Sequence, residues 1–386
     1  MGNFIKNSRK FFSSAGSLDV VNSSTQIEID SNNKSKNDFR LTLTSGTAVT
    51  TGDVVNASTI YLTPYKGNVI SLYNGTNWVS YESNEISLAL GTLTNKTPYD
   101  VFCYANSSIP TLEFTAWTDE TNRATALTTQ DGILVKSGAT TRRYLGTFYN
   151  AGNQTATVTI SNASPCVITY TGHNLDANAP VVFTTSGGLP SGIVAGTTYY
   201  VASLGTIGTN TFNISATPGG ALINTTTAGS GTHTCTVGTY TEDSQLNRYL
   251  WNSYNQANRK LFRVESTTSW NYTTATYRQA NANKANQFNF INGLETPLFI
   301  ISQQRVGNSI AGTNVIGGLG LDSITTPTVT YAMSNPVAAA GSPNLTNCVY
   351  NDSVGVGKHY VSFIEYSTAA GTTTWYAFAV KANIFN

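Results

Sequence analysis

Short runs in which apolar and polar residues alternate recur along most of this 386-residue chain. In one of them Phe39, Leu41 and Leu43 stand between polar neighbours. A period of two puts alternate side chains on opposite faces of a strand, so one face of each run can cover a core. Long stretches with the 3.6-residue period of an amphipathic helix are nearly absent. The pattern predicts an all-β fold.

Turn signals between these runs indicate hairpins. Asn74-Gly75 separates the runs 68–73 and 77–82, and Asn-Gly at such a place is a strong signal for a two-stranded hairpin. Runs 98–105 and 111–117 form a second expected pair. A first strand is expected at Thr25–Ile29. The best helix candidate is 119–128, because Asp119 and Glu120 favour a helix start.

Charge is distributed unevenly along the chain. Only 11% of residues are charged, against roughly 25% in typical soluble proteins. From Ala151 to Gly238 the only charged residue is Asp176, while charge returns at Glu242 and Asp243. The neutral segment has its own short alternating runs with Gly and Pro turns between them. It reads as a small β-sandwich module inserted at a hairpin tip, where insertions are tolerated.

The expected architecture is therefore multidomain, with β-sandwich or jelly-roll-like domains and one β-module inserted in a hairpin of the first domain. A single core would be unusual for 386 residues. The expected divisions are an N-terminal arm at 1–40, a discontinuous first domain at 41–150 plus 239–293, the inserted module at 151–238, and a C-terminal domain at 294–386.

Catalytic and metal-binding patterns are not found in the sequence. The three histidines, His173, His233 and His359, form no HExxH or clustered pattern, and His173 reads as a hydrogen-bonded turn residue. No pair of acids is marked by its spacing as a glycosidase pair. We expect no catalytic, cofactor-binding or metal residues, no cofactor, and no enzymatic activity. A carbohydrate-degrading enzyme remains the weakest of three hypotheses.

The four cysteines are far apart in sequence, which excludes a CxxC site. We expect them to be small buried side chains. If the inserted module has neighbouring first and last strands, Cys166 and Cys235 lie near each other. They are the one pairing that the organisation suggests, although thiols stay reduced in a cytoplasm. No signal peptide is visible, and no apolar run is long enough for a membrane span.

Two groups of aromatic residues have alternative readings. Arg248–Arg263 places aromatic residues among basic ones, a pattern that can bind single-stranded nucleic acid. Packing inside the protein is favoured, because a net charge of +1 gives no basic field, and we expect no nucleic-acid partner. A second group could stack on sugars if exposed but is favoured as core or interface: Trp270, Tyr272, Tyr277, Trp375 and Tyr376.

The first twelve residues combine apolar and basic side chains. We interpret them as a docking arm, with a frayed terminus as the alternative. Its apolar anchors would be Phe4, Ile5, Phe11 and Phe12, and its polar contacts Lys6, Arg9 and Lys10.

Several motifs resemble structural proteins of tailed-bacteriophage virions, of the fibre or decoration type. They are Ile60–Asn68, Leu72–Gly75, Tyr99–Phe102, Val135–Thr147, Asp243-Ser244, Arg248–Asn252, Tyr254-Asn255, Trp270–Tyr272, Tyr277–Ala280, Glu365–Ser367 and Gly371–Tyr376. The neutral segment, with Thr171–His173, Pro180–Phe183 and Gly196–Val201, is similar to a module that recurs in phage fibre proteins. The segment departs from simpler members of the family, which run directly from the strand at 142–149 to Glu242.

The resemblance implies a non-enzymatic structural component of a bacteriophage virion, a tail-fibre or capsid fibre or decoration protein anchored by its arm. It implies a place on the virion surface after assembly in the host bacterial cytoplasm, with other capsid or tail proteins as partners. A homotrimer follows only from how phage fibres usually assemble. The second hypothesis is a receptor-binding protein that recognises host surface glycan.

Overall fold

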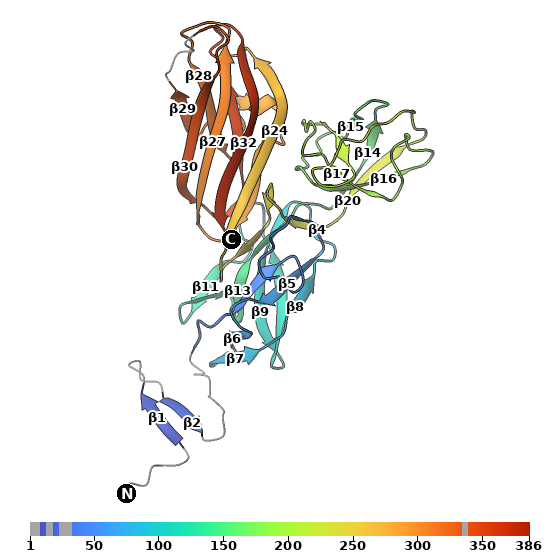
Figure 1. Ribbon diagram of the computed structural model, residues 1–386. Coiled ribbons are helices and arrows are strands. Elements are labelled where there is room, and N and C mark those ends of the chain that lie inside the picture. The colour runs from blue at the N-terminus through green and yellow to red at the C-terminus, as the bar shows by residue number, and fades with distance from the viewer. Residues whose placement is uncertain (1–7, 13–17, 23–32, 334–338) are drawn as a thin grey trace.

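The computed structural model describes residues 8–12, 18–22, 33–333 and 339–386, and it consists almost entirely of strands (Figure 1). The expected all-β, multi-sheet fold is confirmed. One short 3₁₀ turn, η1 (Ala280–Ala282), interrupts the strands of the described part. The hairpin β1 (Ser8–Phe12) and β2 (Leu18–Asn22) precedes the main body. Thr25–Ile29, where a strand was expected, lies outside the described residues.

The first part of the body packs small sheets around one core. Phe39, Leu41, Ile60 and Leu72 are buried in it, as their alternation predicts. One sheet contains β3 (Phe39–Thr42), β5 (Thr59–Pro64) and β8 (Ile86–Ala89). A second contains β10 (Ile109–Ala116), β9 (Thr97–Asn106), β13 (Ala139–Asn150), β12 (Ile133–Lys136) and β11 (Leu127–Gln130), with β23 (Leu250–Asn252) beside β13.

The Asn-Gly hairpin is confirmed, whereas the helix at 119–128 is wrong. β6 (Val69–Tyr73) and β7 (Trp78–Glu82) pair across Asn74-Gly75. The Asp119 carboxylate accepts the backbone N–H groups of Thr121 and Asn122 at 2.8 Å, which closes a turn. Aspartate at such a position supports a turn as readily as a helix start, because its oxygens compete for the same N–H groups.

Residues 154–237 form a seven-stranded sheet whose described strands pair only with one another. Its strands are β14 (Gln154–Ile160), β15 (Ile168–Thr169), β16 (Pro180–Thr185), β17 (Thr198–Val201), β18 (Thr211–Phe212), β19 (Ile214–Ser215) and β20 (His233–Val237). Figure 1 shows this segment projecting to one side of the body. Cys103, Cys166 and Cys235 are buried free thiols, and Cys348 is buried as well. An inserted, separately folding module stays a prediction.

The last part of the chain is a sandwich of two sheets. The core between them contains Phe288, Leu298, Phe363 and Phe378. One sheet has the order β24 (Asn258–Tyr272), β32 (Thr373–Phe385), β27 (Thr296–Asn308) and β30 (Asn344–Val354). The other has the order β29 (Val329–Met333), β28 (Val315–Leu321), β31 (Gly357–Tyr366), β26 (Gln287–Asn292), β22 (Asn247–Arg248), β21 (Thr241–Asp243) and β4 (Val54–Ala57), with β25 (Arg278–Gln279) beside β31.

This pairing differs from the division expected at residue 293. β24 lies beside β32, and β26 lies beside β31, so most of 258–293 shares sheets with the C-terminal strands. No local pattern indicates this pairing, because the register between strands so far apart in the chain is set by tertiary packing.

Buried arginines join the two halves of the body. The Asp243 carboxylate accepts one bond from Arg248 and one from Arg259, each at 2.7 Å. Arg40 donates to the backbone oxygen of Asn386 at 2.5 Å, and burial lowers the pKa of Arg40 to about 10. Charged side chains are buried at this joint because each has carbonyl or carboxylate partners.

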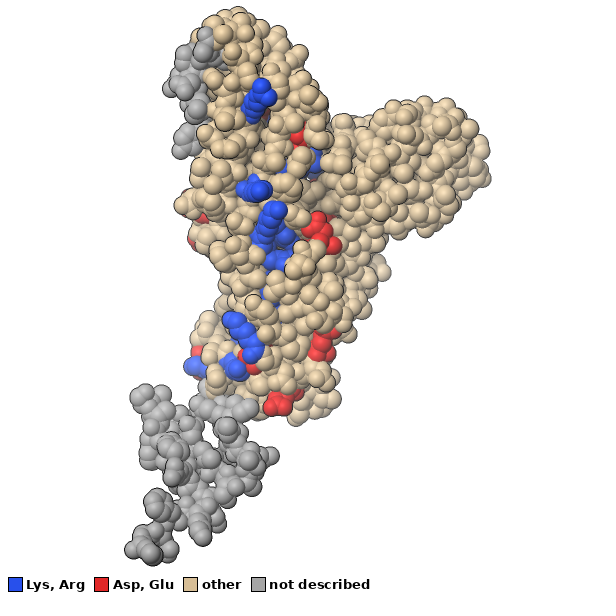
Figure 2. All heavy atoms as spheres, viewed as in Figure 1, with Lys and Arg blue, Asp and Glu red and all other residues tan. Residues whose placement is uncertain are grey.

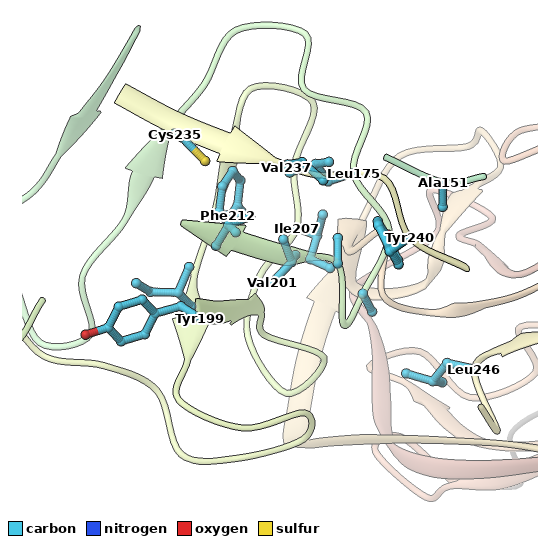
Figure 3. Packing of buried hydrophobic residues seen from close by; sticks show 14 of the residues in the cluster. Ala151, Leu175, Tyr199, Val201, Ile207, Phe212, Cys235, Val237, Tyr240 and Leu246 are labelled. Atoms are coloured by element: carbon cyan, nitrogen blue, oxygen red, sulfur yellow. The ribbon is translucent and has the colours of Figure 1, made fainter. Parts of the chain in front are cut away.

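A continuous apolar core links the projecting segment to the body. Figure 3 shows Val201, Ile207 and Phe212 inside the segment and Tyr240 and Leu246 at its base. All five belong to one buried cluster, so the segment is packed against the body and is not simply tethered to it.

Gly293 allows a close approach between the halves of the body. A Cβ atom there would lie 2.5 Å from Trp251 Cε3 and 2.6 Å from Thr147 Oγ1. We expect Gly293→Ala to destabilise the fold by roughly 1–3 kcal/mol through overpacking, measured as a lower melting temperature. Gly355→Ala is the control, because a Cβ atom there meets nothing within 4 Å. Equal melting temperatures for the two variants would contradict this account.

Candidate functional site

A cavity of about 570 Å³ lies where the first part of the body, the projecting segment and the C-terminal sandwich meet. We call it the junction cavity. Six of its 17 lining residues are charged, against 11% in the whole chain, so charge is concentrated here. The charged residues are Lys96, Glu120, Asp176, Arg278, Lys284 and Lys358.

Asp176 is the single charged residue of 151–238, and its carboxylate points into this junction. Lys284 Nζ lies 3.0 Å from Oδ1, and the Tyr249 hydroxyl donates to Oδ2 at 2.6 Å. Burial alone would raise the pKa of Asp176, but Lys284, Lys358 and the Tyr249 hydrogen bond outweigh burial and hold it below the usual 3.8. Asp176 is therefore ionised at neutral pH and cannot serve as a general acid.

Two lysines from different parts of the chain hold the turn that carries Asp176. Lys96 donates to the Asn174 carbonyl at 2.7 Å. Lys284 donates to the same carbonyl at 3.1 Å and to the Leu175 carbonyl at 2.9 Å. Burial, opposed by Asp176 and reinforced by Lys284, lowers the pKa of Lys96 to about 8. The turn is thus clamped by cations from both sides of the junction.

Two tyrosines continue the network behind the carboxylates. The rings of Tyr149 and Tyr249 lie 5.0 Å apart, and the Tyr149 hydroxyl donates to Glu120. Burial and the neighbouring acids raise the pKa of both phenols well above 10. Both hydroxyls therefore stay protonated and act as donors to the acids.

Lys358 and Arg278 are less fully engaged. The nearest acceptor of Lys358 Nζ in the described chain is Asn289 Oδ1 at 3.5 Å, and its ammonium lies 5.3 Å from the Tyr360 ring centre. Arg278 Nε donates to Glu365 at 2.6 Å, while its guanidinium covers the Tyr272 ring at 3.9 Å. Within the described residues, its terminal nitrogens have no hydrogen-bond acceptor.

A further acid lies at the base of the projecting segment. Glu242 in β21 is buried and accepts Asn247 Nδ2 at 3.0 Å, and the same Asn247 amide donates to the Ala177 carbonyl at 2.8 Å. Burial raises the pKa of Glu242 to about 8. A carboxyl group with this pKa binds its proton more tightly in the folded state than in the unfolded chain.

Most residues that the sequence singled out lie elsewhere. Leu250 and Leu261 are buried, as the packing interpretation of 248–263 predicts. Arg248, Arg259 and Arg263 are also buried, whereas that interpretation placed the charges on the other face or at a subunit contact. In the second aromatic group, Tyr272 and Trp375 are buried, Trp270 and Tyr277 are partly buried, and Tyr376 is partly exposed beside Arg305.

The expected docking arm is only partly described. Phe4, Ile5 and Lys6 lie outside the described residues, and Arg9, Lys10, Phe11 and Phe12 lie on β1. Docking by the arm stays a prediction. The body is anchored from Lys34 onwards, since Arg143 donates to the carbonyls of Lys34 and Lys36 at 3.2 and 2.8 Å.

His173 is a buried turn residue whose Nδ1 accepts the Leu175 N–H at 2.9 Å. Burial and Lys284 lower its pKa to about 4. In the part of the chain that the structure describes, no three His, Cys, Asp or Glu side chains come together as a metal site would require. The described residues also contain no helix long and apolar enough to cross a membrane.

No family model matches the chain, and no curated protein matches it significantly. Similar solved structures include dimeric latent PorU from Porphyromonas gingivalis, at 7% identity and TM-score 0.25, over 53% of this chain and 22% of PorU. The infectious bursal disease virus Gx strain structure matches at 15% identity and TM-score 0.25, over 76% of this chain and 69% of that one. The chain spans about a fifth of latent PorU. At these scores the likenesses identify neither a fold family nor a function.

Replacing Asp176 tests the role of its charge. Asp176→Asn should lower the melting temperature at neutral pH, because Lys284 loses its carboxylate partner in a partly buried place. The difference from the native protein should shrink as pH falls through the acid range, since the depressed pKa of Asp176 stabilises the fold only while the group is ionised. Asp352→Asn on the exposed surface is the control. Equal changes in melting temperature for Asp176→Asn and Asp352→Asn would exclude a stabilising role for the Asp176–Lys284 ion pair.

The stabilising contribution of Glu242 changes with pH in the opposite direction to that of Asp176. Its stabilising contribution is complete below the unfolded pKa of 4.5 and is lost as pH rises to about 8. Between pH 4.5 and about 8, the free energy of unfolding of the native protein should fall by up to about 1.4 kcal/mol per pH unit relative to that of the Glu242→Gln variant, as thermal unfolding measures. Parallel stability curves for the two proteins would contradict the buried, protonated carboxyl.

Proposed function

We propose that this chain is a non-enzymatic structural component of a bacteriophage virion, a fibre or decoration protein on the particle surface. The sequence resemblance to such proteins supports the proposal. The structural observation that carries it is an exposed apolar face on the C-terminal sandwich, which is suited to contact with a neighbouring subunit.

This outer sheet face belongs to the β24-β32-β27-β30 sheet. Along β27 buried and exposed residues alternate, and Phe299 and Ile301 are 42% and 45% exposed. Ile301 lies opposite Val349 on β30, which is 41% exposed, and Leu345 on the same strand is 50% exposed. Monomeric proteins rarely leave neighbouring large apolar side chains of several strands in water, so such a face marks an interaction site.

Basic side chains surround the apolar ones on this face. Lys260 lies 4.5 Å from the Phe262 ring centre, and Arg305 lies 4.7 Å from that of Tyr376. Lys381 stands opposite Ile301. Outward positions of the two central strands carry no acid in the described sequence. Figure 2 shows blue side chains spaced along this side of the sandwich.

These charges indicate the chemistry of the partner. A surface with apolar and acidic side chains complements the face, whereas a second identical face would bring like charges together. We therefore propose that the outer sheet face packs against another capsid or tail protein. The homotrimer stays a prediction, and it would use a different surface.

Introducing charge into the face tests this proposal. The double variant Ile301→Asp and Val349→Asp should reduce incorporation into particles by about tenfold or more, because buried unpaired carboxylates cost at least about 1.4 kcal/mol at an interface. Quantitative mass spectrometry of purified particles measures the incorporation.

The matched control is Val194→Asp on the projecting segment, where the side chain is 63% exposed. Both variants should keep the native circular dichroism spectrum. Normal incorporation of the folded double variant would refute the role of this face.

Recognition of host surface glycan is a second candidate function. The junction cavity favours it, because its cations, phenol rings and hydroxyl groups can contact a sugar.

A further inference from the structure

We infer that the junction cavity binds an acidic saccharide, meaning a sugar residue that carries a carboxylate or a sulfate group. This inference deepens the second candidate function and rests on it. The virion role and the outer sheet face do not depend on it.

The size and position of the cavity suit one or a few sugar residues. Its volume of about 570 Å³ falls within the roughly 300–1,000 Å³ typical of small-molecule sites. The lining comes from all three parts of the chain, including Lys96 from the first, Thr209 from the projecting segment, and Tyr360 from the sandwich. A bound ligand would therefore contact groups that folding brings together from distant places in the sequence.

The charge balance of the cavity favours an anion. Four cationic side chains face two carboxylates. The Asp176 carboxylate is already occupied by Lys284 and Tyr249, and Glu120 accepts the Tyr149 hydroxyl. Neither acid contacts Lys358 directly, and Arg278 is paired with Glu365 outside the lining, so the excess positive charge lies on the Lys358 side of the cavity.

Lys358 and Arg278 have unused donors for an oxyanion. A lysine ammonium has three N–H donors, and among the described residues the only acceptor within hydrogen-bonding distance of that of Lys358 is the Asn289 amide oxygen, 3.5 Å away. Arg278 donates its Nε–H to Glu365, and its two terminal nitrogens remain available as donors to a ligand. A partly buried cation without a close acceptor is poorly solvated, so an incoming carboxylate or sulfate gains charge-assisted hydrogen bonds there.

The rest of the lining suits a sugar better than a bare anion. Tyr360 presents a half-buried ring next to Lys358, and aromatic rings stack on the apolar faces of sugars. The hydroxyl groups of Tyr360 and Thr209 form no hydrogen bond within the described structure and can exchange bonds with sugar hydroxyls. Ile207 and Ile324 supply apolar walls.

Calorimetric titration of the full chain with defined oligosaccharides tests the inference. The probes are a trimer of galacturonic acid, a sulfated galactose trimer, the neutral galactose trimer, inorganic sulfate and a short single-stranded oligonucleotide. We expect one or both acidic trimers to bind and to raise the melting temperature, with the neutral trimer and inorganic sulfate at least about tenfold weaker. The two acidic probes distinguish carboxylate from sulfate.

Two variants locate the binding. Lys358→Gln and Tyr360→Leu should each weaken the acidic trimer by about tenfold, while Lys66→Gln, at an exposed lysine outside the cavity, should leave it unchanged. Native melting temperatures without ligand show that the variants fold.

Three results would overturn the inference. They are equal affinity for neutral and acidic trimers, unaltered binding by a folded Lys358→Gln variant, and tighter binding of the oligonucleotide at the same site. Adhesion of the protein to host cells without affinity for acidic trimers would refute this ligand class and leave glycan recognition standing. If the protein neither adheres to host cells nor binds the acidic trimers, glycan recognition is refuted as well.

Discussion

The ion pair between Asp176 and Lys284 joins the projecting segment to the body at the point where the three parts of the molecule meet. The projecting segment has no other charge. Lysines from both halves of the body donate to the turn that carries Asp176, and Arg263 donates to the Ser203 carbonyl of the same segment at 2.5 Å. Because Asp176 is nearly enclosed, its charge acts in a medium where pairing matters more than at the surface. Tyr240 and Leu246 contribute buried apolar surface to the contact between the segment and the body. The directional bonds to the turn at Asp176 fix the orientation of the segment in that contact.

Charge is sparse elsewhere, and several of the charged side chains are buried. Arg40, Arg143, Arg248 and Arg259 are buried and bind carbonyl or carboxylate oxygens that join one segment to another. The solvent-facing surface relies on hydroxyl and amide groups, and the projecting segment carries no blue or red atoms in the view of Figure 2. Such a surface suits a protein held at high local density, since charge repulsion does not oppose close approach.

Local patterns predicted local structure well. Alternation and the Asn74-Gly75 turn indicated the early strands, and the fall in charge after Ala151 marked the segment whose strands pair among themselves. The turn at Asp119 was misread, because an acid before a short apolar run fits either a helix start or a turn. The pairing of β24 with β32 and the gathering of Lys96, Lys284 and Lys358 around Asp176 depend on tertiary register, which no local pattern contains. A lone acid in a neutral segment was the one available clue.

Cryo-electron microscopy of intact particles tests the central claim most directly. The account predicts density for this chain on the particle surface, with the outer sheet face of β24, β32, β27 and β30 covered by an acidic, apolar surface of another virion protein. A chain absent from purified particles would contradict the structural role. A chain present with that face open to solvent would contradict the proposed contact.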